Sequence, residues 1–218
     1  MFKYLKKKHA LSFVNDGKIR IATLYEFRLN EKKNLEIFDH DEGKITVYDD
    51  NLIFDTAYPE SVQKQSKLVK QFLSNTKGVR VTATGATLAI INNSPNLYIY
   101  SLSKEYSEIT MKKLGYDACI EIINPSYFFL ELNEILYYRK LIKQFAVSEC
   151  IYQSRKMHHS KVKNLHPVWI KDEYFSYQKE IRAVWEPVNE VILPKIIEEK
   201  GLKKYVRLHS VLEPNLFV

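Results

Sequence analysis

The sequence predicts a single α+β domain. Short β-like segments are scattered along the 218 residues between only a few helical ones, whereas a doubly wound parallel sheet would alternate the two regularly. Hydrophobic residues make up 45% and aromatic residues 13%, which is enough for a packed core and excludes a disordered chain. No repeat or linker composition divides the sequence, so we expect one domain over residues 1–218.

Alternation of polar and apolar residues predicts the strands. Residues 18–24 alternate as a half-buried strand does, with Ile19 and Ile21 on one face and Arg20 on the other. Arg20 is therefore expected to point away from the core. The other β-like segments are 79–83, 87–91, 97–102, 118–123 and 147–153.

Helical spacing predicts two further regions. From Pro59, apolar residues recur at helical spacing as far as Leu73, and the polar side of this helix carries lysines. Residues 126–145 are rich in Leu, Ile, Tyr and Phe and predict either one helix or a helix followed by a strand. Periodicity alone does not choose between these two.

Basic residues exceed acidic ones by 33 to 26, a formal net charge of +7. Two stretches, residues 61–80 and 155–171, contain basic residues and no carboxylate. Such stretches are either solvated surfaces or surfaces that attract the phosphate backbone of a nucleic acid. On the second interpretation the candidate contacts are Lys64, Lys67, Lys70, Arg155, Lys156, Lys161 and Lys163.

The cysteine content and hydropathy indicate a cytoplasmic protein. Cys119 and Cys150 are too few for a disulfide framework, and neither lies at metal-ligand spacing from another Cys or His. No apolar run approaches the roughly 20 residues that cross a bilayer, and the N-terminal segment is too polar for a secretion signal. We expect buried reduced thiols and no membrane association.

An acidic group around residue 40 is a candidate cation site. The carboxylates and the imidazole of residues 39–42, together with Asp49 and Asp50, could bind a hard divalent cation. A metal-dependent nuclease built on Asp39, Asp41 and Glu42 is the third function that we consider. Their spacing matches no known loop motif, however, and Glu42-Gly43 is typical of an exposed hairpin turn. His158, His159 and His166 lack a nearby carboxylate or thiolate in the sequence. We predict no metal site.

Residues 177–185 alternate so that Gln178, Glu180 and Arg182 share one face of a predicted strand. Residues i and i+2 of a strand are about 7 Å apart, so Gln178 and Glu180 can reach one ligand. Ser101 and Ser103 share a strand face in the same way. The alternative is that Glu180 and Arg182 form an exposed structural ion pair, worth at most about 1 kcal/mol.

These elements resemble those of a known enzyme family. Arg20, then Ser101-Leu102-Ser103, then Gln178-Lys179-Glu180 resemble, in the same order, the arginine, Ser-x-Ser and Gln-x-Glu elements of ADP-ribosyltransferases. The segments around them also resemble a group of uncharacterised bacterial domains. The resemblance spans most of the chain through few, short matches, and Arg28 competes with Arg20 for the arginine position. It implies a split, mostly antiparallel β core flanked by a few helices.

The resemblance further implies an enzyme that cleaves NAD and transfers ADP-ribose to a macromolecule. Glu180 would face the positive charge that develops on the ribose, and Gln178 would orient the acceptor. Arg20 or Arg28 would bind the pyrophosphate. The residues that would support the pocket or stack on the nicotinamide are Ser101, Ser103, Tyr25 and Tyr100.

The basic composition makes RNA or DNA the expected acceptor of this transfer. The resemblance implies a toxin or defence effector, for which a neutralising partner protein is an expectation. The alternative function is a basic nucleic-acid-binding domain without enzymatic activity. The absence of a Gly-rich phosphate loop or a Gly-x-Ser-x-Gly motif argues against a Rossmann, P-loop or α/β-hydrolase enzyme.

Overall fold

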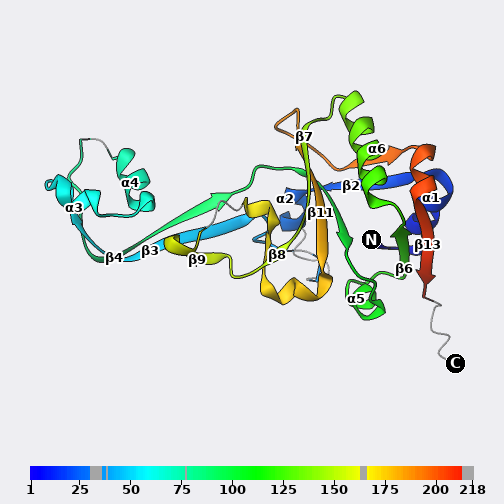
Figure 1. Cartoon of the computed structure of the whole chain (residues 1–218), viewed down its shortest axis with the longest axis horizontal. Coiled ribbons are helices and arrows are strands. Elements are labelled where there is room, and N and C mark those ends of the chain that lie inside the picture. The colour runs from blue at the N-terminus through cyan, green and yellow to red at the C-terminus, as the bar shows by residue number, and fades with distance from the viewer. Residues whose placement is uncertain (30–35, 38, 77, 163–165, 213–218) are drawn as a thin grey trace.

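The computed structural model describes residues 1–29, 36–37, 39–76, 78–162 and 166–212 (Figure 1). Its main feature is an eight-stranded sheet in which all strand pairs are antiparallel. The predicted α+β class is therefore confirmed. The strands of this sheet are β1 (Phe2–Leu5), β2 (Lys18–Thr23), β5 (Tyr98–Ser103), β6 (Ala118–Ile122), β7 (Ile142–Glu149), β11 (Glu180–Pro187), β12 (Lys195–Glu198) and β13 (Val206–Val211).

The sheet divides at strand β5. Along one edge, β5 pairs with β11 over its whole length, and β11 pairs in turn with β7. Along the other edge, β2 pairs with Tyr98 and Ile99, whereas β1 pairs with Ser103. In the described chain, residues 100–102 have no strand partner on this edge. The sheet is therefore split between β1 and β2.

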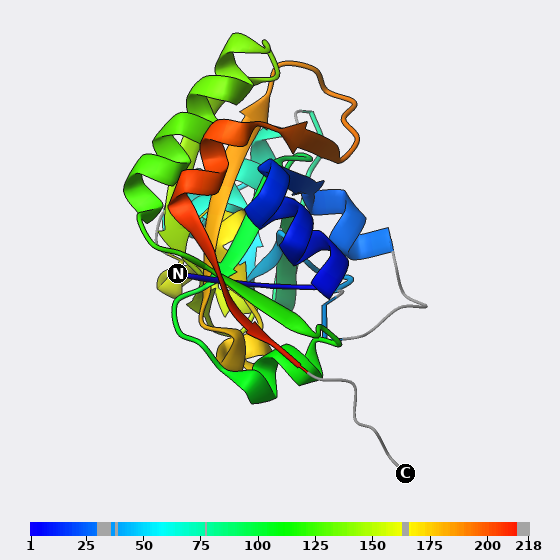
Figure 2. The ribbon, with the colours of Figure 1, turned by 90° about the vertical axis from the view of Figure 1, so that its right-hand side faces the viewer.

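Two helices, α1 (Lys7–Asp16) and α6 (Pro125–Tyr138), pack against this sheet and close its main core (Figure 2). Phe13 of α1 and Phe128 of α6 lie with their ring centroids 6.0 Å apart, and both are buried with Trp185 of β11. The structure decides between one helix and a helix followed by a strand for residues 126–145, because α6 ends at Tyr138 and β7 begins at Ile142. The region is a helix followed by a strand.

A long hairpin extends away from the eight-stranded sheet (Figure 1). It consists of β3 (Lys44–Asp55) and β4 (Thr82–Asn93), with two helices, α3 (Pro59–Gln63) and α4 (Lys67–Ser74), at its far end. We call residues 44–93 the arm. The predicted strands 79–83 and 87–91 are wrong as separate elements, because residues 82–93 form the single strand β4.

The predicted helix from Pro59 is also divided. Ser66 lies between α3 and α4, and its hydroxyl caps α4 by accepting a hydrogen bond from the backbone N–H of Val69. The remaining elements are α2 (Leu24–Leu29), α5 (Glu108–Lys113), β8 (Ile151–Tyr152), β9 (Lys156–His158), β10 (Ile170–Lys171), and the 3-10 helices η1 (His159–Lys161), η2 (Pro167–Trp169), η3 (Glu173–Gln178) and η4 (Lys200–Tyr205).

Both cysteines are free and buried, and burial raises the pKa of each thiol to about 12. Cys119 lies on β6, and Cys150 follows β7 directly. They therefore act as small apolar side chains of the core. No helix in the described part of the chain is long and apolar enough to span a membrane.

Candidate functional site

A cavity of about 670 Å³ lies at the split in the sheet, a size typical of small-molecule sites. Residues of β1, β2, β5 and α1 line it together with the beginning of β11. Six residues that the resemblance assigned to catalysis or to NAD binding also line this cavity, although they come from three separate segments of the chain. They are Arg20, Tyr100, Ser101, Ser103, Gln178 and Glu180.

The pairing of β5 with β11 explains how two of these segments meet. Glu180 lies opposite Ser103, and Arg182 lies opposite Ser101. Directly opposed residues of antiparallel strands point to the same face, so the Ser-x-Ser and Glu-x-Arg side chains share one face. The prediction that Gln178 lies on the same strand is wrong, because it ends η3 and Lys179 turns the chain with a φ of 43°.

Glu180 belongs to a buried network of two carboxylates and two cations. The Lys171 ammonium donates to Glu180 Oε2 at 2.5 Å and to Gln178 Oε1 at 2.6 Å. Arg182 donates to Glu180 Oε1 and to Glu42 Oε1, both at 2.7 Å. We call Glu42, Lys171, Glu180 and Arg182 the buried ion network.

The side chains of the buried ion network are at most 7% exposed. The ion pair that the alternative interpretation predicted between Glu180 and Arg182 is therefore present, but it is buried and not exposed. Burial alone would raise the pKa of Glu180, but the charges of Arg182 and Lys171 outweigh it and hold this pKa well below its ordinary value. Burial likewise opposes the charge of Arg182, yet the surrounding anionic groups raise its pKa. Glu180 is thus a fixed, ionised carboxylate.

The acidic group near residue 40 does not assemble into a cation site. Asp39 forms a bidentate ion pair with Arg155, and Glu42 is held by Arg182. Asp41 is the exposed member of the group. Because arginines already neutralise two of the three carboxylates, the structure does not favour a nuclease site built on them. The Arg155 side chain is in turn only 13% exposed in this pair, which does not favour its predicted contact with nucleic acid.

Lys3 is a cavity residue that sequence reasoning missed. Its ammonium donates to the Ser101 carbonyl at 2.6 Å, within the part of β5 that has no strand partner at the split. The pKa of Lys3 is lowered to about 8, chiefly by desolvation; Glu180 opposes this shift and Arg20 adds to it. The available signal was the alternation of Lys3 with Phe2 and Tyr4, which is typical of a strand.

The structure separates the two candidate arginines. Arg20 lines the cavity, where its side chain is half-exposed and paired with Glu26. Arg28 instead donates to the backbone carbonyls of residues 42 and 43, and its guanidinium lies 4.4 Å from the ring centroid of Tyr25. Neither Arg28 nor Tyr25 is among the cavity-lining residues. Their predicted contacts with NAD do not fit this geometry.

The predicted β5 residues occupy different environments in the cavity wall. Tyr100 is buried, which raises the pKa of its hydroxyl. The Ser103 hydroxyl lies 2.6 Å from the Glu105 carbonyl oxygen and 3.0 Å from that of Gln178, and its hydrogen is shared between them. Ser103 therefore ties β5 to the end of η3. The side chain of Ser101 is half-buried.

The predicted nucleic-acid contacts differ in their exposure to solvent. Lys171, at the end of the second basic stretch, belongs to the buried ion network, and Lys163 lies outside the described residues. Lysines of the arm and of the segment around β9 remain accessible. The exposed candidates are Lys64, Lys67, Lys70, Lys156 and Lys161.

No protein-family model matches the sequence, and comparisons with curated proteins and with solved structures found no significant match. A functional interpretation of this chain therefore depends on the cavity and on the residues that line it.

Proposed function

We propose that the chain is an ADP-ribosyltransferase that binds NAD as a substrate in the cavity at the split. One observation carries this proposal. The arginine, Ser-x-Ser and Gln-x-Glu elements, which resemble those of ADP-ribosyltransferases, line a single cavity although they are far apart in the sequence. If these three short motifs resembled the family only by chance, there would be no reason for them to line the same cavity.

The basic residues of the cavity suit the pyrophosphate of NAD. Arg20 offers a planar, half-exposed guanidinium that can bind a phosphate through two parallel hydrogen bonds. Lys3 lies on the same cavity wall. With a pKa of about 8 it is mostly protonated at neutral pH, and a bound phosphate would favour its charged form. We therefore assign Arg20 and Lys3 to the pyrophosphate.

Glu180 suits the reacting end of NAD. Cleavage of the bond between the ribose and nicotinamide leaves positive charge on the ribose, and a preorganised carboxylate stabilises that charge. Lys171 and Arg182 keep Glu180 ionised and fixed in position. Since Glu42 balances the second cation, the buried ion network is formally neutral and does not repel the charge developing on the ribose.

Gln178 is fixed next to Glu180. Its amide oxygen accepts from Lys171, and its amide nitrogen donates to the Glu36 carbonyl at 2.8 Å. We assign Gln178 to positioning the acceptor, and the accessible lysines of the arm favour RNA or DNA as that acceptor. If the chain were instead a basic nucleic-acid-binding domain without enzymatic activity, the same lysines would be sufficient for binding and the cavity would have no role.

The test is NAD turnover by Glu180→Gln compared with Glu105→Gln. Glu105 is an exposed carboxylate paired with Lys179 on the surface, so its substitution is the matched control. We expect Glu180→Gln to lose at least about 100-fold, as for other groups that stabilise transition-state charge, and Glu105→Gln to retain wild-type turnover. Circular dichroism checks that both variants are folded. A folded Glu180→Gln protein that keeps more than about a tenth of the turnover would contradict the assignment.

A further inference from the structure

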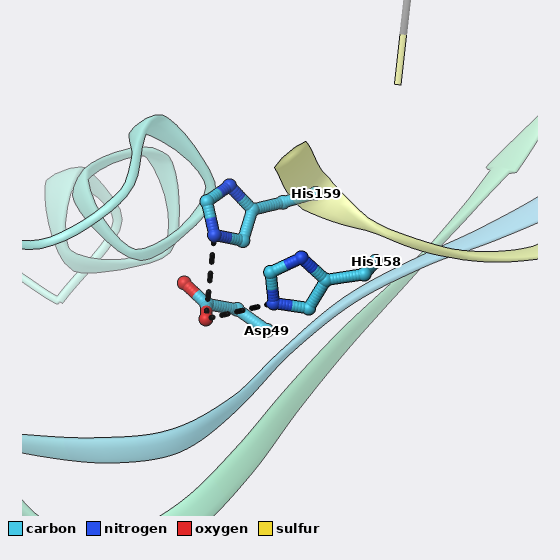
Figure 3. Close-up of side chains that lie close together, drawn as sticks. All are labelled: Asp49, His158 and His159. Carbon is cyan, nitrogen blue, oxygen red and sulfur yellow. Dashed lines mark ion pairs between the residues drawn. The ribbon is translucent and has the colours of Figure 1, made fainter. Parts of the chain in front are cut away.

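A second cluster of chemically versatile side chains lies outside the cavity, where the arm meets β9 (Figure 3). Asp49 is on β3, His158 ends β9, and His159 begins η1. The parallel pairing of β3 with β9 sets Tyr48 opposite His158, which brings the two histidines beside Asp49 although 109 residues separate Asp49 from His158. The ligand atoms of the three side chains all lie within 4.8 Å of one another.

We propose that Asp49, His158 and His159 form a binding site for a zinc ion. The Asp49 Oδ1 atom lies 3.5 Å from His159 Nε2 and 3.8 Å from His158 Nε2. Zinc binds such atoms at about 2.0–2.2 Å in a tetrahedron, so its ligands are roughly 3.4 Å apart. Both oxygen–nitrogen distances are within a few tenths of an ångström of that spacing, and the two histidine nitrogens lie within 4.8 Å of each other.

The position of Asp49 on its strand is unusual for a carboxylate. It follows Ile45 and Val47 on the inward face of β3, and it is buried as they are. The strand is irregular directly after it, where Asn51 has a φ of 54° and the pairing with β4 shifts. A buried carboxylate in an apolar row requires compensation by cations or hydrogen bonds. A metal ion supplies that compensation.

Neighbouring groups hold the ligands in orientations that suit an ion. The Ser66 hydroxyl donates to Asp49 Oδ2, which leaves Oδ1 directed at the histidines. His158 Nδ1 lies 2.8 Å from the Ser160 hydroxyl and accepts a hydrogen bond from the Ser160 backbone N–H at 3.3 Å, so Nε2 is the nitrogen that faces Asp49. Carboxylates that bind metal ions are commonly hydrogen-bonded, as Asp49 is here.

The donor types indicate zinc rather than magnesium or calcium. Two imidazole nitrogens and one carboxylate oxygen suit zinc, whereas the other two ions prefer oxygen ligands throughout. The histidine side chains are 29% and 32% exposed, so a fourth position is open to water or to Asp50, whose carboxylate lies 3.8 Å from His158 Nε2. A bound ion would fasten the arm to the β9–η1 segment, and Ser66 would extend this link to α4.

The experiment measures Zn²⁺ binding to the full chain by calorimetry after treatment with a chelator and dialysis, with Mg²⁺ as the comparison ion. We expect one Zn²⁺ per chain, no comparable binding of Mg²⁺, and a rise in melting temperature with Zn²⁺. His158→Ala and His159→Ala should each weaken Zn²⁺ binding at least about tenfold. The matched control is His40→Ala, which removes an exposed imidazole outside the cluster and should not change the affinity.

Two sets of results would contradict the proposed zinc site. If Zn²⁺ does not bind stoichiometrically, or if Mg²⁺ binds as well as Zn²⁺, the site is not the one proposed. If Zn²⁺ binds but folded His158→Ala and His159→Ala proteins bind it as the wild type does, the ion is elsewhere. Asp49→Asn keeps the shape of the side chain and should also lose affinity, so a folding defect of one histidine variant does not block the test.

Discussion

The buried ion network and the exposed lysines of the arm place their charges in opposite ways. In the network, Glu180 and Arg182 are buried, and each charge has a partner within 2.7 Å. On the arm, Lys67 and Lys70 are exposed, and neither forms an ion pair within the described part of the chain. Charges that satisfy one another fix geometry, whereas exposed charges are available to a partner. We therefore expect the buried ion network to serve a reaction and the exposed lysines of the arm to attract a negatively charged partner.

The largest expected effect is the loss of one member of the buried ion network. Arg182→Ala leaves Glu180 and Glu42 buried with fewer cations, so we expect it to lower the free energy of unfolding by about 3–5 kcal/mol. Chemical denaturation measures this. The control, Lys179→Ala, removes an exposed partner of Glu105 and should cost about 0–1 kcal/mol. Similar losses in both variants would break the contrast between buried and exposed pairs.

This network also shows what the sequence could predict about the site. The shared face of Glu180 and Arg182 could be predicted from the sequence because strand alternation is local, and the same holds for Ser101 and Ser103. The burial of that face could not be predicted. Lys171 and Glu42 approach Glu180 and Arg182 from elsewhere in the chain, and no local pattern encodes such a contact.

The arm shows why part of the fold was missed. Alternation in β3 is interrupted where Asn51 takes a positive φ, and β4 has Gly85 at a φ of 62°. Such irregularities divide one long strand into short runs when only alternation is followed, as in the separate strands predicted for residues 79–83 and 87–91. The proposed zinc site was missed for a related reason, because the carboxylate for His158 and His159 comes from the distant Asp49.

The next largest effect concerns the pH dependence of NAD binding. The pKa of Lys3 in the free cavity is about 8, and a bound phosphate raises it, so the favourable charge is complete below about pH 8 and is lost above it. We expect NAD affinity to fall about tenfold as the pH rises past this value. Lys3→Arg, which keeps its charge, should abolish the fall. Calorimetric titrations at several pH values measure both, and identical profiles would exclude Lys3 from the pyrophosphate site.

The smallest effect concerns the arm. If Lys67 and Lys70 contact phosphates, their joint replacement by Gln should reduce the slope of log K against log salt for nucleic-acid binding by about 1.4–1.8 in magnitude. The rate of NAD hydrolysis should not change, since neither Lys67 nor Lys70 lines the cavity. The control is Lys112→Gln, an exposed lysine of α5 paired with Glu108. A fluorescence titration that finds the same slope in all three proteins would remove the arm as a nucleic-acid surface.

Calorimetric titration of NAD into the Arg20→Ala variant tests whether NAD occupies the cavity at the split in the sheet. Arg20 is half-exposed, so its removal leaves the core intact, and Arg80→Ala removes a comparable exposed arginine on the arm as the control. We expect Arg20→Ala to weaken NAD binding at least about tenfold, because a charged hydrogen bond to phosphate is lost, and Arg80→Ala to bind NAD as the wild type does. Equal affinity in the wild type and both variants would show that Arg20 does not bind NAD in this cavity.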